Sequence, residues 1–357
     1  MEEPEEGLGR LAAQYFQVVD IQHLQFPPNT VLLKPLVQEW IARNMFDETT
    51  VWPIPPLNYR SRVLKLLLLK IEQTISDPEE DEISDDLMAI WGDLVARPKP
   101  SPLQEAQKLS YIKYTPPKVQ GCQTGQPIIT SENRGLILSS GTTGFRTWEA
   151  SLHLATFLST PEGKSLVSGK SLLELGAGTG LVSMYCIKCL DANTAIVTDR
   201  EPTLIANAQD CIARNGLDPR KIEACIWEWG GPLNNSKYMQ EQGLSHAIDT
   251  ALGADLGRHG GGYLIPGVFR GHLQIYDVDL VPLLVSTLED LFDNYSLKQF
   301  VLSATLRNQE TFNTFLAACE TKRWNVVQLG FESPPAGSQD AFFHPTDVPI
   351  RTYRICQ

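Results

Sequence analysis

The stretch that decides the fold is Ser171-Leu-Leu-Glu-Leu-Gly-Ala-Gly-Thr-Gly-Leu181. Its first residues are apolar and predict a short buried strand, which breaks into a glycine-rich turn. The apolar run that follows, from Leu181 to Ile187, predicts a helix. Strand, glycine turn and helix form the first unit of a nucleotide-binding α/β sheet. Gly176, Gly178 and Gly180 allow a tight turn and the close approach of a ligand, which would face the amides of the helix N-terminus.

The residues around this turn distinguish between ligands. The dinucleotide fingerprint is Gly-x-Gly-x-x-Gly, whereas the spacing here is Gly-x-Gly-x-Gly, with Leu181 in the place of the last dinucleotide glycine. Glu174 would repel a pyrophosphate but could hold a cationic amino-acid group. The next predicted strand ends in Asp199, an acid that suits the two hydroxyls of a ribose. Acid, glycines and acid together resemble the S-adenosylmethionine site of the seven-strand methyltransferases, so S-adenosyl-L-methionine is the expected cofactor.

Composition and charge narrow the class of protein. The chain has 357 residues and a net charge of -12, and we therefore expect no direct nucleic-acid partner. No apolar run approaches the roughly 20 residues of a membrane span, and the acidic N-terminus lacks the features of a signal peptide. Seven irregularly spaced cysteines fit a reducing compartment. We therefore expect a cytoplasmic protein with no membrane partner, in which the pair Cys186 and Cys189 packs in the core.

The N-terminal third of the chain differs from the rest in its pattern of apolar residues, which predicts helices only. Apolar residues at three- and four-residue spacing predict helices over Gly7 to Val19, Val31 to Arg43, Tyr59 to Ile75 and Asp85 to Ala96. Residues 97–118 are rich in Pro, Lys and Ser and predict a linker. We predict an N-terminal helical domain over residues 1–118, either a plain helical domain or one that recognises a substrate, and a second domain over residues 119–357.

The second domain predicts an alternation of strands and helices. Ile128 to Ser139 reads as a hairpin around a polar turn, and Trp148 to Leu158 as a helix with Thr147 as its N-cap. Trp148 could cover a bound adenine or methionine group, and the alternative is a tryptophan that packs in the core. The later predicted elements are the helix Thr203 to Asn215, the strands Lys221 to Trp229 and Ala247 to Leu256, the helix Asp277 to Phe292, the strand Phe300 to Arg307, the helix Thr311 to Thr321, and an antiparallel pair, Trp324 to Phe331 with Ile350 to Gln357. This order predicts a doubly wound sheet with strands beyond the sixth.

Four motifs make the resemblance specific. They are Gly141-Thr-Thr-Gly-x-x-Thr-Trp-Glu-Ala, Leu173-Glu-Leu-Gly-x-Gly-x-Gly, Trp227-Glu-Trp-Gly and Gly253-Ala-Asp. Together they resemble the seven-strand protein-lysine methyltransferases called methyltransferase family 16. The first motif, preceded by a helical domain, resembles the branch that methylates a lysine of translation elongation factor 2.

The resemblance implies an α/β fold with a doubly wound, seven-strand, Rossmann-like methyltransferase sheet and an N-terminal helical domain. It also implies a protein-lysine N-methyltransferase with elongation factor 2 as its protein substrate, and we expect a monomer. The family's cofactor contacts correspond here to Trp148, Gly176, Ala177, Gly178, Asp199, Trp229 and Ala254, to which the argument above adds Glu174.

The sequence departs from the family after the fourth predicted strand. The family has an Asp, two residues and a Tyr there, but residues 257–274 separate Asp255 from Tyr276. Joining Leu256 directly to Ile275 restores Asp-Leu-Ile-Tyr-Asp. We interpret the segment as an insertion, either a real loop or a translated intron. The implied catalytic residues are Asp255, which would accept a hydrogen bond from the lysine amine and aim its lone pair, and Tyr276, which would border the lysine channel.

Other classes of protein remain open. An NAD-dependent dehydrogenase is disfavoured by the glycine spacing and by Glu174. A scaffold that keeps the methyltransferase fold but has weakened or lost transfer is favoured by the interrupted Asp/Tyr motif alone. A small-molecule or nucleic-acid methyltransferase is disfavoured because the Asn/Asp-Pro-Pro-Tyr signature of amino-methylating DNA enzymes does not follow the fourth predicted strand.

Overall fold

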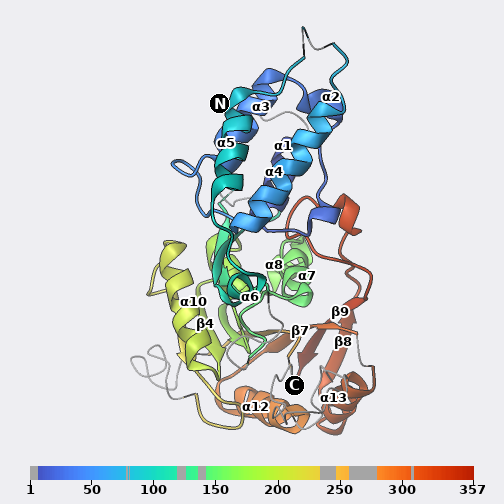
Figure 1. Ribbon diagram of the computed structural model, residues 1–357. Coiled ribbons are helices and arrows are strands. Elements are labelled where there is room, and N and C mark those ends of the chain that lie inside the picture. The colour runs from blue at the N-terminus through green and yellow to red at the C-terminus, as the bar shows by residue number, and fades with distance from the viewer. Residues whose placement is uncertain are drawn as a thin grey trace, which may run out of the picture. The chain divides into compact units, whose positions relative to one another are not determined.

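The computed structural model describes residues 7–77, 79, 81–118, 126–135, 142–233, 247–256, 280–306 and 309–357. The chain divides into two compact units, Met1–Thr115 and Pro116–Gln357. Within the described ranges, no helix is both long and apolar enough to cross a membrane. Figure 1 shows the first unit in blue and teal and the second from green to red.

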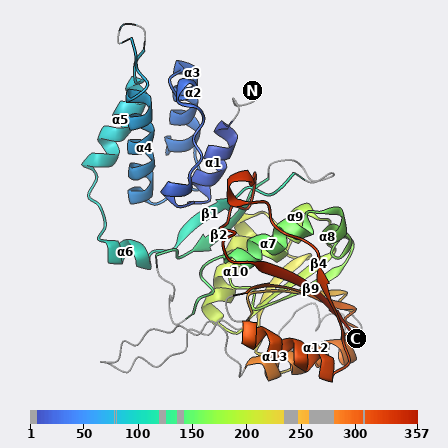
Figure 2. The same cartoon turned by 90° about the vertical axis from the view of Figure 1, so that its right-hand side faces the viewer.

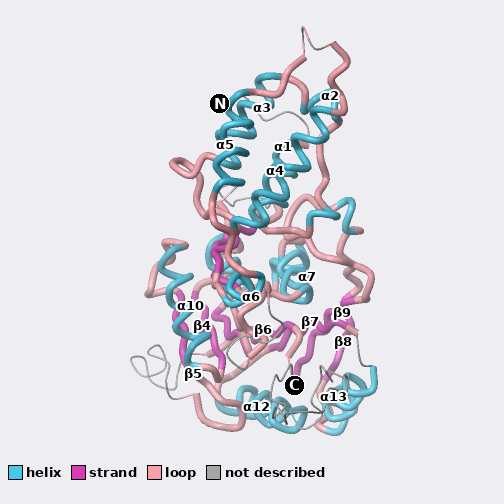
Figure 3. Tube along the Cα trace, viewed as in Figure 1, coloured by secondary structure: helices cyan, strands magenta, loops and turns pink. Residues whose placement is uncertain are grey.

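The first unit is built mainly of helices (Figure 3). Its elements are α1 (Leu8–Phe16), η1 (Ile21–His23), α2 (Asn29–Leu32), α3 (Pro35–Ile41), the π-helix η2 (Ala42–Phe46), α4 (Leu57–Glu72), α5 (Asp85–Ala96), α6 (Pro102–Gln107) and β1 (Ser110–Tyr114). Leu11, Leu64 and Leu87, from three of these helices, are fully buried in one shared core. The helix predicted over Val31 to Arg43 is interrupted, because Pro35 has no amide hydrogen to continue it and instead begins α3.

The linker predicted over residues 97–118 is wrong in its middle, where α6 and β1 lie. The Ser101 hydroxyl accepts from the Gln104 amide and the Gln104 side chain accepts from the Ser101 amide, which forms a capping box. Pro102 occupies the first turn, where its missing N–H costs nothing. These local interactions start a helix in a segment whose composition suggested none.

The second unit contains a seven-stranded sheet (Figure 2). Its strands are β3 (Ser171–Leu175), β4 (Thr194–Asp199), β5 (Ile222–Ile226), β6 (Thr250–Ala254), β7 (Gln299–Thr305), β8 (Asn325–Leu329) and β9 (Ile350–Cys356). The spatial order is β5-β4-β3-β6-β7-β9-β8, with β9 antiparallel to both of its neighbours and the other pairs parallel. The doubly wound, seven-strand sheet is thus confirmed, and the carboxyl ends of β3, β4, β5 and β6 meet at one edge.

Helices cover both faces of this sheet. They are α7 (Glu149–Leu158), α8 (Pro161–Ser165), α9 (Leu181–Cys189), α10 (Pro202–Arg214), α12 (Leu280–Asn294) and α13 (Gln309–Thr321), with η4 (Ala336–Ser338) before β9. Helices α7 and α9 pack together on one face, and α12 and α13 pack together on the other (Figures 1 and 2). Leu288 of α12 and Phe300 of β7 are fully buried in the core between the sheet and that second pair.

A short strand, β2 (Ile128–Glu132), precedes α7 and is buried along its whole length. The side chain of Asn215, at the end of α10, accepts from the Ile129 amide at 2.9 Å and donates to the Ile129 carbonyl at 2.7 Å. The first half of the predicted hairpin is therefore a strand, whereas residues 136–139 of its second half lie outside the described residues. This strand extends beyond the apolar residues, because the polar residues Thr130, Ser131 and Glu132 also belong to it.

Candidate active site

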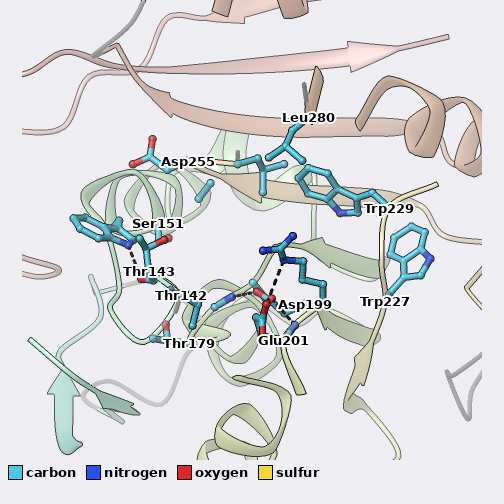
Figure 4. A pocket seen from close by; sticks show the side chains of 18 of the residues that line it. Thr142, Thr143, Ser151, Thr179, Asp199, Glu201, Trp227, Trp229, Asp255 and Leu280 are labelled. Carbon is cyan, nitrogen blue, oxygen red and sulfur yellow. Dashed lines mark hydrogen bonds and ion pairs between the residues drawn. The ribbon is translucent and has the colours of Figure 1, made fainter. Parts of the chain in front are cut away.

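A cleft of about 1040 Å³, open mouth included, lies at the carboxyl edge of the sheet. It is bordered by the ends of β3, β4, β5 and β6, by the segment before α7 and by the start of α12 (Figure 4). The residues predicted from sequence that line it are Trp148, Gly176, Ala177, Gly178, Asp199, Trp229, Ala254 and Asp255. Glu174 is not among the lining residues, and Tyr276 and residues 257–274 lie outside the part of the chain that the structure describes. The described residues thus bring most of the predicted site together.

The glycine turn between β3 and α9 is shaped by backbone that other residues rarely adopt. Gly176, Gly178 and Gly180 have φ values of 56°, 54° and 71°. A Cβ atom on Gly178 would come within 2.9 Å of the Gly144 carbonyl oxygen, so the two segments touch through their backbones. The Gly178 N–H donates to Oδ2 of Asp199 at 3.1 Å. The turn is therefore fixed both to the segment before α7 and to the end of β4.

Asp199 closes β4 at the floor of the cleft, where Figure 4 shows its contacts as dashed lines. Its Oδ1 accepts from the Glu201 N–H at 3.2 Å. Burial raises the pKa of this carboxyl, and the backbone donors of Glu201 and Gly178 oppose the rise. A carboxylate fixed in this way can still accept hydrogen bonds from two neighbouring hydroxyl groups.

Aromatic side chains form two walls of the cleft. Trp229 is half-buried beside Leu256, Leu280 and Leu283, which gives a flat apolar surface. Trp148 lies at the start of α7, where its indole N–H donates to the Thr143 carbonyl at 3.0 Å. The Arg146 guanidinium stacks 4.6 Å from the centre of the Trp148 ring. One wall therefore suits an aromatic base, and the other combines an aromatic ring with a positive charge.

Asp255 follows β6 directly and is held in a strained conformation. Its φ of 49° lies in the left-handed region, which a non-glycine residue adopts only at a cost. Both carboxylate oxygens are held by Thr305 at the end of β7: Oδ1 accepts from the Thr305 amide at 2.8 Å and Oδ2 from its hydroxyl at 2.9 Å. Asp255 is buried and lines the cleft, so its carboxylate is fixed there rather than left to rotate.

Comparison with known proteins agrees with this geometry. A sequence model described as lysine methyltransferase matches residues 136–256. The protein-lysine N-methyltransferase EFM3 of Chaetomium thermophilum is 38% identical over 349 residues, which cover 98% of this chain and 96% of that protein. The human protein-lysine N-methyltransferase EEF2KMT is 31% identical over 94 residues, 26% of this chain and 28% of that protein. The EEF1A lysine methyltransferase 3 of Xenopus tropicalis is 28% identical over 144 residues, 40% of this chain and 50% of that protein.

The chain belongs to the lysine methyltransferase family. It is a protein-lysine N-methyltransferase that uses S-adenosylmethionine. The interpretation as an NAD-dependent dehydrogenase is therefore set aside.

Glu174 of this methyltransferase lies below the cleft rather than in its lining. Its side chain is buried, and Oε2 accepts from the backbone amide of Ser183, in the first turn of α9, at 2.9 Å. Burial raises its pKa to about 7, opposed by the Ser183 hydrogen bonds, while the charge of Asp199 raises it further. Glu174 therefore supports the glycine turn through its hydrogen bond to the Ser183 amide. Its direct contact with a cationic group stays a prediction.

This raised pKa predicts a pH dependence of stability. Between the ordinary value of 4.5 and the folded value of about 7, the folded methyltransferase holds a proton that the unfolded chain has lost. Stability therefore falls as pH rises through this window, by roughly 1–3 kcal/mol. Glutamine does not titrate, so Glu174→Gln should not lose this stability as the pH rises. The difference in thermal midpoint, variant minus parent, should therefore increase from pH 4.5 to pH 7 and stay constant above pH 7. Thermal unfolding at several pH values measures this difference, and a constant difference would contradict the assignment.

Several functional candidates were missed or misplaced in the sequence. Thr147 does not cap α7, whose N-cap is Trp148, because the Thr147 hydroxyl instead contacts Glu132 and Thr179. The sequence pattern puts Glu132 in a polar turn, yet its side chain is fully buried. Arg146, Thr179 and Glu201 also line the cleft.

Proposed function

We propose that the cleft binds S-adenosylmethionine with its ribose on Asp199 and its adenine against Trp229. The observation that carries this proposal is the meeting of the glycine turn, Asp199 and Trp229 at the carboxyl edge of the sheet, where doubly wound folds bind ligands. In Figure 4, Trp229 and Asp255 lie on opposite sides of Asp199. The methionine end of the cofactor would then extend toward Trp148 and Asp255.

The proposed chemistry is the transfer of a methyl group to a lysine amine. When bound, the cofactor supplies a sulfonium-activated methyl group as the electrophile. A lysine amine has a pKa of about 10.4 and must lose a proton before it attacks. A neighbouring positive charge and partial burial both favour the neutral amine. Asp255, held by Thr305, would accept a hydrogen bond from the amine and aim its lone pair at the methyl carbon.

In this step a nitrogen–carbon bond forms, a sulfur–carbon bond breaks, and the amine proton passes to solvent. Most of the rate would come from in-line positioning. Tyr276 stays a proposed border of the lysine channel and lies outside the described residues.

A binding experiment tests the placement of the cofactor. S-adenosylhomocysteine should raise the thermal midpoint of the full chain, because a ligand that binds only the folded state stabilises it. Asp199→Ala should weaken this binding by roughly 1–3 kcal/mol, the scale of lost charge-assisted hydrogen bonds. Equal affinity in parent and variant, measured by titration calorimetry, would remove Asp199 from the site.

We further propose that the protein substrate is translation elongation factor 2. The support is the resemblance of the Thr142-Thr-Gly-x-x-Thr-Trp-Glu segment to the branch that methylates this factor, together with the human relative whose name contains EEF2. The name of the relative from Xenopus tropicalis contains EEF1A, so elongation factor 1A is the competing candidate substrate.

We place the reaction in the cytoplasm and expect the enzyme to act as a monomer. Within the described residues the cysteines form no disulfide, which fits a reducing compartment.

The N-terminal unit is proposed to recognise the protein substrate. It has its own core, and Leu36, Met88 and Val95 expose 78%, 46% and 49% of their surface. Deleting residues 1–100 removes helices α1 to α5 and should lower kcat/KM for elongation factor 2 by roughly 10-fold or more, while S-adenosylhomocysteine affinity changes little. Methylation assays on the intact factor and calorimetry measure the two quantities. If the truncated enzyme methylates the factor as fast as the full chain, this unit has no recognition role.

A further inference from the structure

The chemistry above does not use the buried carboxylate of Glu132, at the end of β2. Its side chain is fully buried. Oε1 accepts from the hydroxyls of Thr130 and Thr147, both at 2.7 Å. Oε2 accepts from Nε of Arg134 at 3.1 Å and from the backbone amide of Thr147 at 3.3 Å. A buried carboxylate is costly unless it is paired and hydrogen-bonded, and this one meets donors on both oxygens.

These contacts fix the direction of a hydrogen-bond chain that ends in the cleft. A threonine hydroxyl carries a single proton, and that of Thr147 is donated to Glu132. The Thr179 hydroxyl, 2.8 Å from Oγ1 of Thr147, must therefore be the donor in that contact. Thr179 lies between Gly178 and Gly180 in the glycine turn and lines the cleft. Its hydroxyl oxygen is left to act toward a ligand only as an acceptor.

Glu132 thereby connects two walls of the cleft that are distant in sequence. Through the amide and hydroxyl of Thr147 it holds the residue that immediately precedes Trp148. Through the Thr147 hydroxyl it also holds the glycine turn at Thr179. The contact between Gly144 and Gly178 lies beside this chain and would loosen if the two segments separated.

The end of strand β2 that carries Glu132, here called the Glu132 anchor, is held in place by hydrogen bonds within the protein. The Asn133 amide donates to the Phe145 carbonyl at 2.7 Å, and the Asn207 side chain donates to the Ser131 carbonyl at 2.9 Å. Asn215 holds Ile129, at the other end of the same strand. Strand β2 thus presents the Glu132 carboxylate from a fixed position, as a preorganised site requires.

We propose that Glu132 is a positioning residue for cofactor binding, which sets the separation of Trp148 and the glycine turn through Thr147 and Thr179. The proposal rests on the proposed placement of S-adenosylmethionine in the cleft. The hydrogen bonds of Glu132 fix the positions of Trp148 and the glycine turn before the cofactor binds. The cofactor therefore does not lose binding free energy in ordering them, and Glu132 raises the affinity without touching the cofactor. Loss of the anchor should therefore raise the KM for S-adenosylmethionine and leave kcat at saturating cofactor close to that of the parent.

The test compares variants of the full-length enzyme by titration with S-adenosylhomocysteine and by steady-state kinetics. Glu132→Gln keeps the shape of the side chain, but its amide nitrogen cannot accept from Arg134 or the Thr147 amide. We expect its dissociation constant to rise roughly 10-fold, the scale of one hydrogen bond to a charged group. Thr147→Val breaks the chain at its middle and should have a similar effect, whereas Thr147→Ser should restore parental affinity. If Glu132→Gln does not fold, Thr147→Val alone tests whether this hydrogen-bond chain contributes to cofactor affinity.

Asn215→Ala is the matched control, because it loosens the same strand at the end away from the cleft. It should lower the thermal midpoint but leave the dissociation constant unchanged. If Asp199→Ala weakens binding while Glu132→Gln and Thr147→Val do not, the positioning role is overturned and the cofactor placement stands. If Asp199→Ala also leaves binding unchanged, the placement is overturned and the positioning role with it. Equal weakening by Asn215→Ala would show a general effect of stability and overturn the proposal.

Discussion

Replacing Asp255 by alanine is expected to lower kcat by roughly 100-fold or more, while S-adenosylhomocysteine still binds with near-parental affinity. Asp255 lies at the end of β6 and lines the cleft, where its strained backbone and the two hydrogen bonds from Thr305 hold the carboxylate in place. Without it the lysine amine loses the group that aims its lone pair, and a misplacement of about 1 Å can cost ~100-fold in rate. Single-turnover methylation at saturating cofactor measures the effect directly.

Asp249 supplies the matched control because it flanks the other end of the same strand. Its carboxylate accepts from the Ser171 amide at 2.9 Å and from the Lys298 ammonium at 2.6 Å, on the amino-terminal side of β6. Asp249→Ala should lower the thermal midpoint but keep kcat, because functional groups of doubly wound sheets gather at the carboxyl ends of strands. A loss of kcat in Asp249→Ala equal to that in Asp255→Ala would show that the loss comes from a weakened sheet rather than from catalysis.

Replacing Gly178 by alanine is expected to weaken S-adenosylhomocysteine binding by roughly 30-fold or more, about 2 kcal/mol. The positive φ of 54° costs an alanine about 1–2 kcal/mol in any setting. Here the new Cβ would also lie 2.9 Å from the Gly144 carbonyl oxygen, so the turn or the segment before α7 must shift. Either shift moves a wall of the cleft. Titration calorimetry on the variant measures the loss.

A substitution at Gly216 distinguishes the effect of backbone strain from the effect of the close approach to Gly144. Gly216 follows α10 with a φ of 63°, and a Cβ atom there meets nothing within 4 Å. Gly216→Ala should therefore lose stability through backbone strain and leave the cofactor affinity unchanged. If both variants bind equally well, the contact between Gly144 and Gly178 is not needed for the site.

The parts of this site that could be predicted from sequence are those set by neighbouring residues. Gly176, Gly178 and Asp199 line one cleft, as expected from the sequence, because a glycine turn and a strand end are local features and parallel strands end at a common edge. Their binding of the cofactor stays a prediction. The alternation of strand and helix patterns predicted the strands themselves, including the final antiparallel pair that β8 and β9 form. Asp255 was predicted from family resemblance alone, since its partner Thr305 lies 50 residues away.

The sequence pattern did not indicate side-chain positions that depend on hydrogen-bond partners elsewhere in the chain. Thr147 reads as an N-cap, but its hydroxyl is taken by Glu132, 15 residues earlier, and by Thr179, 32 residues later. Glu174 is buried and accepts from the amide of Ser183, which the sequence pattern did not indicate, and its contact with the cofactor stays a prediction. The helix α6 is different, because its Ser101 and Gln104 capping box was visible in the sequence and composition concealed it.

Purified substrates provide the best test of our proposal that this methyltransferase modifies a lysine of elongation factor 2. The full chain is incubated with methyl-labelled S-adenosylmethionine and an equal mixture of elongation factors 2 and 1A, and the products are digested and sequenced by mass spectrometry. We expect whole methyl units on a lysine of elongation factor 2, and we expect the Asp255→Ala enzyme to add far fewer of them. Label confined to elongation factor 1A, or absent from both factors, would contradict it.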